Sequence, residues 1–260
     1  MLDLEKRSAG SRDGTDPAGG AVSKWTGPTR EAAVQRMFTA IARVYDLNNS
    51  LLSFGLHHHW KRRAAALVPS LPKGRALDLG AGTGDLALLI EKKMGDAGRV
   101  VAADLNEAML RVGWRKIGRR RLAHRITCLQ ANAGRLGFRN ESFDVVITGF
   151  CIRNVGHLMQ TFLEVRRVLK PGGRFVCLEF SRPRQKWLAK LYDWYSFKLL
   201  PWIGTTVAKD STGVYDYLPA SIRTFPDQER LADLLREAGF QRVSYSNLTC
   251  GIVAIHSAVK

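Results

Sequence analysis

The stretch that most constrains this chain is Arg75–Asp85, where an apolar run carrying one acid leads into three glycines at alternate positions. It reads Arg-Ala-Leu-Asp-Leu-Gly-Ala-Gly-Thr-Gly-Asp, and a helical pattern follows it. A short strand, a glycine turn and a helix together form the nucleotide-binding element of doubly wound α/β folds. Glycines also let bare backbone approach a ligand closely. We therefore expect an α/β fold with a mainly parallel sheet and a ligand at this turn.

The acids around the turn indicate which ligand it binds. A dinucleotide fingerprint has its third glycine where this chain has Asp85. Carboxylates there would repel a pyrophosphate, whereas S-adenosylmethionine has no phosphate and carries a cationic sulfonium and a cationic ammonium. A further acid, Asp104, ends the apolar run Val100–Asp104, where it would face ribose hydroxyls, a feature that dinucleotide enzymes share. From the loop and its acids we predict a site for S-adenosylmethionine made by Asp78, Gly80, Gly82 and Asp104.

Short apolar runs alternate with helical patterns through the middle of the chain, which predicts a mainly parallel sheet with helices on both faces. The expected strands and helices, in order, are 76–79, 86–94, 100–104, 107–117, 126–129, 143–148, 157–169 and 174–180. A helix at 227–238 and an antiparallel strand pair at 243–248 and 252–258 close the chain. Asn106 is placed to cap a helix, and Lys170–Gly173 to end one and turn into the next strand.

Three segments lie outside that alternation. Residues 1–29 lack periodicity and predict a flexible tail before a domain at 30–260. Helical patterns within 30–70 predict a helical cap that covers the ligand. Residues 182–226 form an aromatic insertion that holds three of the six tryptophans, Trp187, Trp194 and Trp202. That insertion is either a buried helix or a greasy lid at an interface.

The formal net charge of +17 predicts an anionic partner, either nucleic acid or anionic lipid, unless it serves solubility alone. The densest basic run, 115–125, has no aromatic residue other than the preceding Trp114 on which bases could stack, which argues against nucleic acid as the partner. Four separate cysteines without a C-x-x-C pair indicate neither a metal site nor disulfides, and favour a reducing cytoplasm. No apolar run reaches the roughly 18 residues of a membrane span, so any membrane contact would be peripheral.

Several motifs together resemble one family, the ubiquinone/menaquinone biosynthesis C-methyltransferases, from about residue 34 to the C-terminus. The glycine loop and Lys-Pro-Gly-Gly are common to many methyltransferases, whereas the His57 block, Arg153-Asn154-Val155 and the two C-terminal blocks are specific to this family. The matching elements are Tyr45-Asp46, Ser53-Phe-Gly55 with His57 and Trp60, Asp78–Asp85, Asp104-Leu-Asn106, Arg153-Asn154-Val155, Arg167–Gly173, Leu178–Ser181, Ser221-Ile-Arg223 and Asn247-Leu-Thr249.

The resemblance implies a seven-stranded, Rossmann-like methyltransferase fold. It implies methyl transfer from S-adenosylmethionine to a ring carbon of a reduced polyprenyl quinone precursor: demethylmenaquinol, 2-polyprenyl-6-methoxy-1,4-benzoquinol, or both. By resemblance the cofactor contacts fall on Thr83, Asp104, Asn132 and Ala133, and on Gly149, where the family often has serine. We expect a cytoplasmic enzyme, peripheral to the inner face of an anionic membrane, acting as a homodimer or within a quinone-synthesis complex.

The same motifs supply catalytic candidates. Arg153 could stabilise a quinol phenolate with its fixed guanidinium donors, and Asn154 could orient that oxygen, although Arg153 could instead form a structural ion pair. The proton would go to a water polarised by Arg153 or to His57. Tyr45 is a further candidate for the substrate oxygen or the cofactor lid. Neighbours on a helix diverge by about 100°, so His57, His58 and His59 cannot share a metal. The alternatives are a nucleic-acid methyltransferase and a non-catalytic scaffold.

Overall fold

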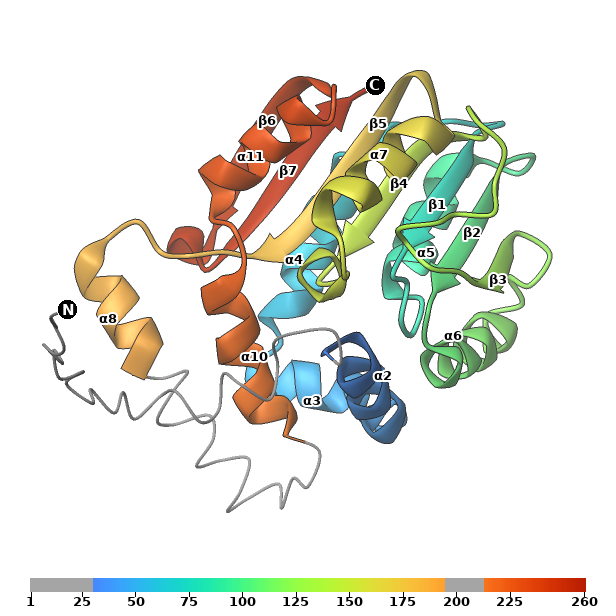
Figure 1. Ribbon diagram of the computed structural model, residues 1–260. Helices are drawn as coiled ribbons and strands as arrows, with labels where there is room; N and C mark the ends of the chain where they lie inside the picture. Colours follow the sequence, from blue (N-terminus) through green and yellow to red (C-terminus); the bar gives the residue numbers. More distant parts are fainter. Residues whose placement is uncertain (1–29, 195–212) are drawn as a thin grey trace, which may run out of the picture.

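A computed structural model describes residues 30–194 and 213–260 (Figure 1). The segment 1–29, for which we expected a flexible tail, lies outside the described residues. So does 195–212, the part of the aromatic insertion that contains Trp202. The remaining chain forms one seven-stranded sheet with helices packed against it.

The sheet confirms the predicted doubly wound architecture. Its strand order is β3-β2-β1-β4-β5-β7-β6, and neighbours are parallel from β3 to β5, whereas β7 runs antiparallel between β5 and β6. Chain order reverses between β1 and β4, so the carboxyl ends of these two strands flank a crevice, the usual ligand position in such sheets. The strands are β1 (Arg75–Leu79), β2 (Arg99–Asp104), β3 (Ile126–Gln130), β4 (Phe143–Gly149), β5 (Leu169–Phe180), β6 (Gln241–Leu248) and β7 (Val253–Val259).

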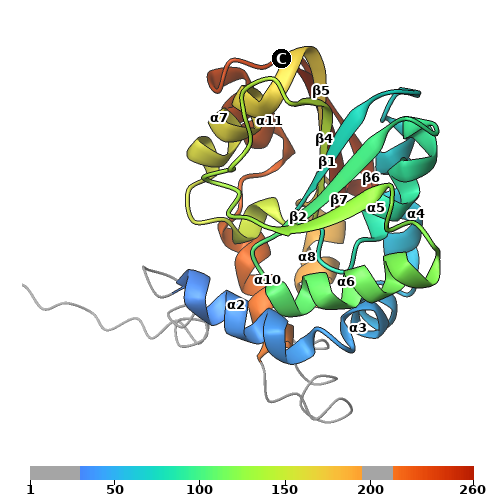
Figure 2. The same ribbon diagram turned by 90° about the vertical axis from the view of Figure 1, so that its right-hand side faces the viewer.

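Helices bury both faces of the sheet, as the continuous apolar strands require (Figure 2). On one face, side chains such as Trp60, Leu86 and Ile117 join a core with β1, β2 and β4. On the other face, Phe162 and Leu235 join a second core with β4 and β5. The first face carries α4 (Leu56–Ala66), α5 (Asp85–Ile90), the 3-10 turn η1 (Glu91–Met94) and α6 (Glu107–Arg119); the second carries α7 (Leu158–Val168) and α11 (Gln228–Glu237).

A third cluster covers the carboxyl ends of the strands (Figure 1). It is built by α2 (Arg30–Ile41), α3 (Tyr45–Leu52) and α10 (Val214–Thr224), which bury side chains such as Met37, Ile41 and Tyr217 together. Within the helical cap predicted at 30–70, α2 and α3 therefore cover the carboxyl ends of the strands, whereas α4 packs against one face of the sheet. Helix α8 (Lys186–Trp194) lies apart from α10 at the same end of the molecule (Figure 1).

Two local predictions can be checked in detail. Asn106 caps α6 as expected, because its Oδ1 accepts a hydrogen bond from the Met109 amide at 3.1 Å. The expected turn at Lys170–Gly173 is instead a bulge inside β5. Leu169 already pairs with Phe143 and Arg174 pairs with Val145, so the ladder resumes across the bulge. Strand β5 thus begins directly where α7 ends.

Candidate active site

Two adjoining cavities lie at the carboxyl edge of the sheet. One, of about 230 Å³, is lined by polar groups from the ends of β1, β2 and β4 and from α2. The other, of about 430 Å³, is mostly apolar and is lined from α2, α3, α4, α8 and α10. Phe38, Tyr45 and Phe150 line both cavities. A ligand in the polar cavity would therefore meet a ligand in the apolar cavity at this aromatic wall.

The glycine loop after β1 presents bare backbone to the polar cavity. Gly80 has φ +68°, and a Cβ there would lie 2.1 Å from the Cys151 sulfur, so the loop and the β4 turn fit together only without a side chain. Gly82, with φ +54°, also lines the cavity. The loop was predicted from its glycine spacing, but its contact with Cys151 was not, because that residue follows a different strand.

Asp104 joins the loop to the end of β2. Its Oδ2 accepts a hydrogen bond from the Gly82 amide and its Oδ1 accepts one from the Asn106 amide, both at 2.8 Å. Burial raises the pKa of this carboxyl, although the backbone amides oppose the shift. Each oxygen keeps a lone pair, so Asp104 can also accept from ribose hydroxyls in the cavity that it lines.

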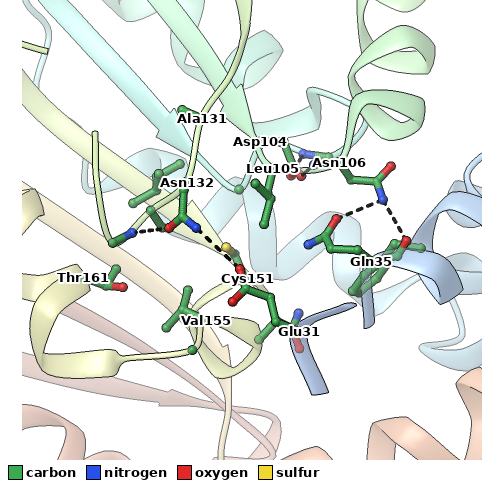
Figure 3. A pocket seen from close by; sticks show the side chains of 18 of the residues that line it. Glu31, Gln35, Asp104, Leu105, Asn106, Ala131, Asn132, Cys151, Val155 and Thr161 are labelled. Atoms are coloured by element: carbon green, nitrogen blue, oxygen red, sulfur yellow. Dashed lines mark hydrogen bonds between the residues drawn. The ribbon is translucent and has the colours of Figure 1, made fainter. Parts of the chain in front are cut away.

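The predicted Asn132, Ala133 and Gly149 also line the polar cavity. Asn132 Oδ1 accepts from the Gly134 amide at 2.8 Å, while its Nδ2 donates to Glu31 Oε1 of α2 at 3.5 Å, across the cavity mouth (Figure 3). At Gly149 a Cβ would lie 2.7 Å from Leu86 Cδ1, so a serine there would require the end of the Leu86 side chain to shift. Glu31, which sequence reasoning missed, comes near Asn132 only through the fold.

Two predicted cofactor residues do not line the polar cavity. Asp78 is fully buried, and its Oδ2 accepts from the Ala87 amide in the first turn of α5 at 2.8 Å. Burial raises the pKa of Asp78 to about 7. The Thr83 hydroxyl donates to Asp46 Oδ1 of α3 at 2.6 Å. These two side chains therefore hold the loop in place through hydrogen bonds formed outside the cavity.

A chain of alternating charges attaches the overlying helices to this loop. Lys116 of α6 contacts both Asp46 of α3 and Asp85 of α5 at 2.7 Å, and Lys61 of α4 contacts Asp85 at 2.8 Å. Burial acts to raise the pKa of Asp85, but Lys61 and Lys116 reverse this and hold the pKa well below its usual range. No local pattern pairs residues so distant in the chain, so sequence reasoning missed this network.

The polar cavity fits S-adenosylmethionine by its donor set. Its carboxylates, Asp104 and Glu31, suit a ligand with two cationic centres. Its glycine backbone lets that ligand lie close to the main chain. The described lining includes one arginine, Arg135, and no lysine, so a pyrophosphate would be repelled by the carboxylates of Asp104 and Glu31 with little compensation. Among the described residues, no group of three His, Cys, Asp or Glu side chains is placed to hold a metal.

Arg153 is fixed in the wall of the apolar cavity. Its Nη1 lies 2.6 Å from Glu179 Oε1, and its Nε donates to Ser221 Oγ at 3.2 Å. Burial acts to lower the pKa of Arg153, but the Glu179 carboxylate reverses this, so the guanidinium stays charged. The ion pair that we considered as an alternative role is therefore present, and it holds the cation at the cavity. The neighbouring Asn154 lines the polar cavity and accepts a hydrogen bond from the Tyr217 hydroxyl.

The remaining catalytic candidates surround the same space. His57 lines the apolar cavity and is buried, whereas His58 and His59 are exposed. Burial and then Lys61 lower the pKa of His57 to about 4, so its ring is neutral at pH 7. Burial also raises the pKa of the Tyr45 phenol, which stays protonated at the wall shared by both cavities.

The fold and the polar cavity define an S-adenosylmethionine-dependent methyltransferase. Solved structures agree on the fold: a SAM-dependent methyltransferase from Aquifex aeolicus has a TM-score of 0.54 at 17% identity, covering 94% of this chain and 98% of that one. A possible histamine N-methyltransferase from Thermotoga maritima has a TM-score of 0.60 at 20% identity, covering 86% and 99%.

Sequence comparison identifies the family. The model of the ubiE/COQ5 methyltransferase family matches residues 27–260, so the chain belongs to that family. The ubiquinone/menaquinone biosynthesis C-methyltransferase UbiE of Yersinia enterocolitica is 45% identical over 231 residues, which are 89% of this chain and 92% of that protein. The UbiE protein of Shewanella frigidimarina is 41% identical over 87% of this chain and 90% of its own length. The chain is thus a C-methyltransferase that uses S-adenosylmethionine, as predicted.

Proposed function

We propose that this enzyme methylates a ring carbon of a reduced polyprenyl quinone precursor, either demethylmenaquinol or 2-polyprenyl-6-methoxy-1,4-benzoquinol. The observation that carries the proposal is the pair of adjoining cavities. A mostly apolar space of about 430 Å³ suits a quinol ring and the start of an isoprenoid chain. It meets the polar cavity at Phe38, Tyr45 and Phe150, where a methyl group and a ring carbon would come together.

The residues of the apolar cavity supply what the ring needs. S-adenosylmethionine provides an already activated methyl group, so the protein has to align the ring and increase the electron density at its carbon. The Arg153 guanidinium, held by Glu179, faces a cavity with few polar groups and would stabilise a quinol phenolate there. Tyr45, at the shared wall, can donate its phenolic hydrogen to the same or the second ring oxygen. The aromatic lining limits water at the reacting carbon.

The rim of the apolar cavity supports contact with an anionic membrane, where such a substrate resides. Phe54, Leu191 and Trp194 line the cavity, yet their exposed fractions are 81%, 53% and 58%. Exposed Lys190 precedes Leu191 on α8 and adds positive charge beside it, and exposed Arg43 follows α2. Apolar side chains with neighbouring cations are typical of surfaces that lie in the headgroup region of a bilayer. Among the described helices, none is both long enough and apolar enough to cross a membrane.

The activity is tested by transfer of labelled methyl from S-adenosylmethionine to each quinol, and to bulk nucleic acid, in separate reactions under reducing conditions. Label in one or both quinols supports the proposal and identifies the substrate. Label in nucleic acid alone would reject the proposal and would indicate that the net charge of +17 serves to bind a nucleic-acid substrate.

Membrane contact is tested separately by cosedimentation with anionic and neutral liposomes at low salt. Replacing Phe54 and Trp194 with serine should weaken the binding to anionic liposomes several-fold, because each removes apolar area from the interface. The matched control is Leu163→Ser, which changes a side chain of similar exposure, 51%, on α7 over the other face of the sheet. Equal binding by all variants, or no binding by the native enzyme, would contradict the docking surface.

A further inference from the structure

Ser53 and His57 form a hydrogen-bonded pair in the wall of the apolar cavity. Ser53 follows the last residue of α3, and His57 stands in the first turn of α4. The turn between them contains Gly55 with φ +75°, which brings the two helix ends together. The distance from Ser53 Oγ to His57 Nδ1 is 2.9 Å.

The direction of this hydrogen bond follows from the other bonds of Ser53. Its hydroxyl donates to the Asn49 carbonyl oxygen at 2.6 Å, and a carbonyl can only accept. The hydroxyl has one hydrogen, so Ser53 Oγ must act as an acceptor toward His57. It accepts the His57 backbone amide at 3.2 Å and, with its second lone pair, the ring Nδ1–H. In a neutral imidazole the other nitrogen, Nε2, then carries the lone pair.

The lone pair of Nε2 has no hydrogen-bond partner among the described residues. The atom is buried, and His57 as a whole is 3% exposed. A buried nitrogen acceptor without a partner is costly, and such groups are concentrated at functional sites. The ring stays neutral, because burial and the Lys61 ammonium both oppose its protonation. His57 therefore has an unprotonated nitrogen without a partner, in the wall of a cavity that the Arg153 guanidinium also lines.

We propose that Ser53 holds His57 in the tautomer protonated on Nδ1, so that Nε2 accepts the proton from a ring hydroxyl of the quinol. The inference rests on the proposed function, since the quinol is the proton donor. His57 is the base that touches the substrate, and Ser53 is a positioning residue that acts through it.

The step balances as follows. The quinol O–H bond breaks and an N–H bond forms at Nε2, which leaves an imidazolium beside a phenolate paired with Arg153. The ring carbon then forms a bond to the methyl group while the S–CH₃ bond breaks, and S-adenosylhomocysteine leaves. The imidazolium returns its proton to the ring oxygen as the carbon loses its own hydrogen to water, which restores the aromatic ring. One proton is released overall, so no oxidant or reductant is required.

The tautomer is measured without any substrate, from the ring ¹H–¹⁵N correlations of the ¹⁵N-labelled enzyme. Of the six histidines, His57 is identified by the signals that disappear in His57→Asn. We expect the native pattern to show a proton on Nδ1, and Ser53→Ala to shift it toward a mixture. Ser53→Thr keeps a hydroxyl and should keep the native pattern. A proton on Nε2 in the native enzyme would overturn the inference.

Kinetics then tests the role of the pair. His57→Asn keeps an amide donor toward Ser53 but has no nitrogen at the Nε2 position, and should lower kcat by about 100-fold, the scale of general base catalysis. Ser53→Ala should lower kcat by about 10-fold with an unchanged KM for S-adenosylmethionine, since a fraction of the enzyme molecules still has His57 in the active tautomer. Ser53→Thr should restore the rate.

Ser50→Ala is the matched control, because the Ser50 hydroxyl donates to the Asp46 carbonyl oxygen at 2.8 Å in the same helix but contacts no imidazole. It should leave the ring signals of His57 unchanged and kcat close to native. A native kcat in His57→Asn, with quinol methylation intact, would overturn the inference and leave the proposed function standing. Absence of methylation of either quinol by the native enzyme would reject the proposed function, whatever the tautomer.

Discussion

Replacing Glu179 with glutamine removes the carboxylate that faces the Arg153 guanidinium at 2.6 Å in the interior of the protein. The two side chains are 1% and 6% exposed, so water cannot replace the lost charge. Breaking a buried pair from one side costs about 3 to 5 kcal/mol, because an uncompensated charge remains. Arg153 keeps neutral contacts with Ser221 Oγ and the Phe150 carbonyl, at 3.2 and 3.3 Å, which places the expected cost at about 3 kcal/mol.

That cost can be measured by thermal and denaturant unfolding. A domain of this size loses about 2 to 4 °C in Tm for each kcal/mol, so Glu179→Gln should lower Tm by about 6 to 12 °C. The double variant Glu179→Gln with Arg153→Met should be more stable than the sum of the single variants predicts, since neither charge remains. The matched control is Glu107→Gln, which breaks an ion pair with Arg111 whose side chains are 60% and 71% exposed, and should cost under about 1 kcal/mol. If Glu179→Gln shifted Tm no more than Glu107→Gln, the assignment of a stabilising role to the buried pair would be refuted.

Three further predictions concern the glycine loop and its supports. Gly80→Ala should abolish cofactor binding in calorimetry and cost about 1 to 3 kcal/mol more stability than Gly82→Ala, whose Cβ would meet only the flexible Met109 side chain at 3.3 Å; equal effects would contradict the packing against Cys151. The pKa of Asp78 is raised to about 7, so its contribution to the stability of the fold is present below the unfolded pKa near 3.9 and is lost as pH rises through 7. The Tm of Asp78→Asn minus that of the native enzyme should therefore increase between pH 4 and pH 8. A difference in Tm that does not change with pH would contradict this. Lys116→Met removes the link from Asp46 to Asp85 and should weaken cofactor binding several-fold and speed proteolysis within α2 and α3, while Lys61 still pairs with Asp85; unchanged proteolysis would exclude a role in holding the cap.

The features that sequence predicted best are those set by neighbouring residues. The glycine spacing after an apolar run placed the loop at Gly80 and Gly82, and the acid that ends the next strand, Asp104, faces the same cavity. These positions follow from the local geometry of a strand, a turn and a helix, together with the meeting of parallel strands at one edge. The Lys170–Gly173 turn was misjudged because pairing of Leu169 with β4, a long-range contact, extends β5 through it.

The contacts that hold the site together were not predictable in this way. The Arg153–Glu179 pair joins a turn after β4 to the end of β5, and the Asp46–Lys116 pair joins α3 to α6. Each pair forms between segments that are distant in the chain and that only the fold brings together. The sequence does not show which of the 23 Asp and Glu side chains pairs with a given Arg or Lys. The roles of the catalytic candidates, and the homodimer or complex that we expect, stay predictions.

The aromatic wall between the two cavities also bears on how enzymes with this architecture diversify. Among the described lining residues, Phe38, Tyr45 and Phe150 alone belong to both cavities, so most side chains that would select the acceptor are separate from those that would hold the methyl donor. Substitutions on α8 and α10 can therefore reshape the acceptor cavity without changing a residue that lines the donor cavity. Drift in acceptor preference, in nature or by directed evolution, would then need few compensating changes, and those would concentrate at the three aromatic positions.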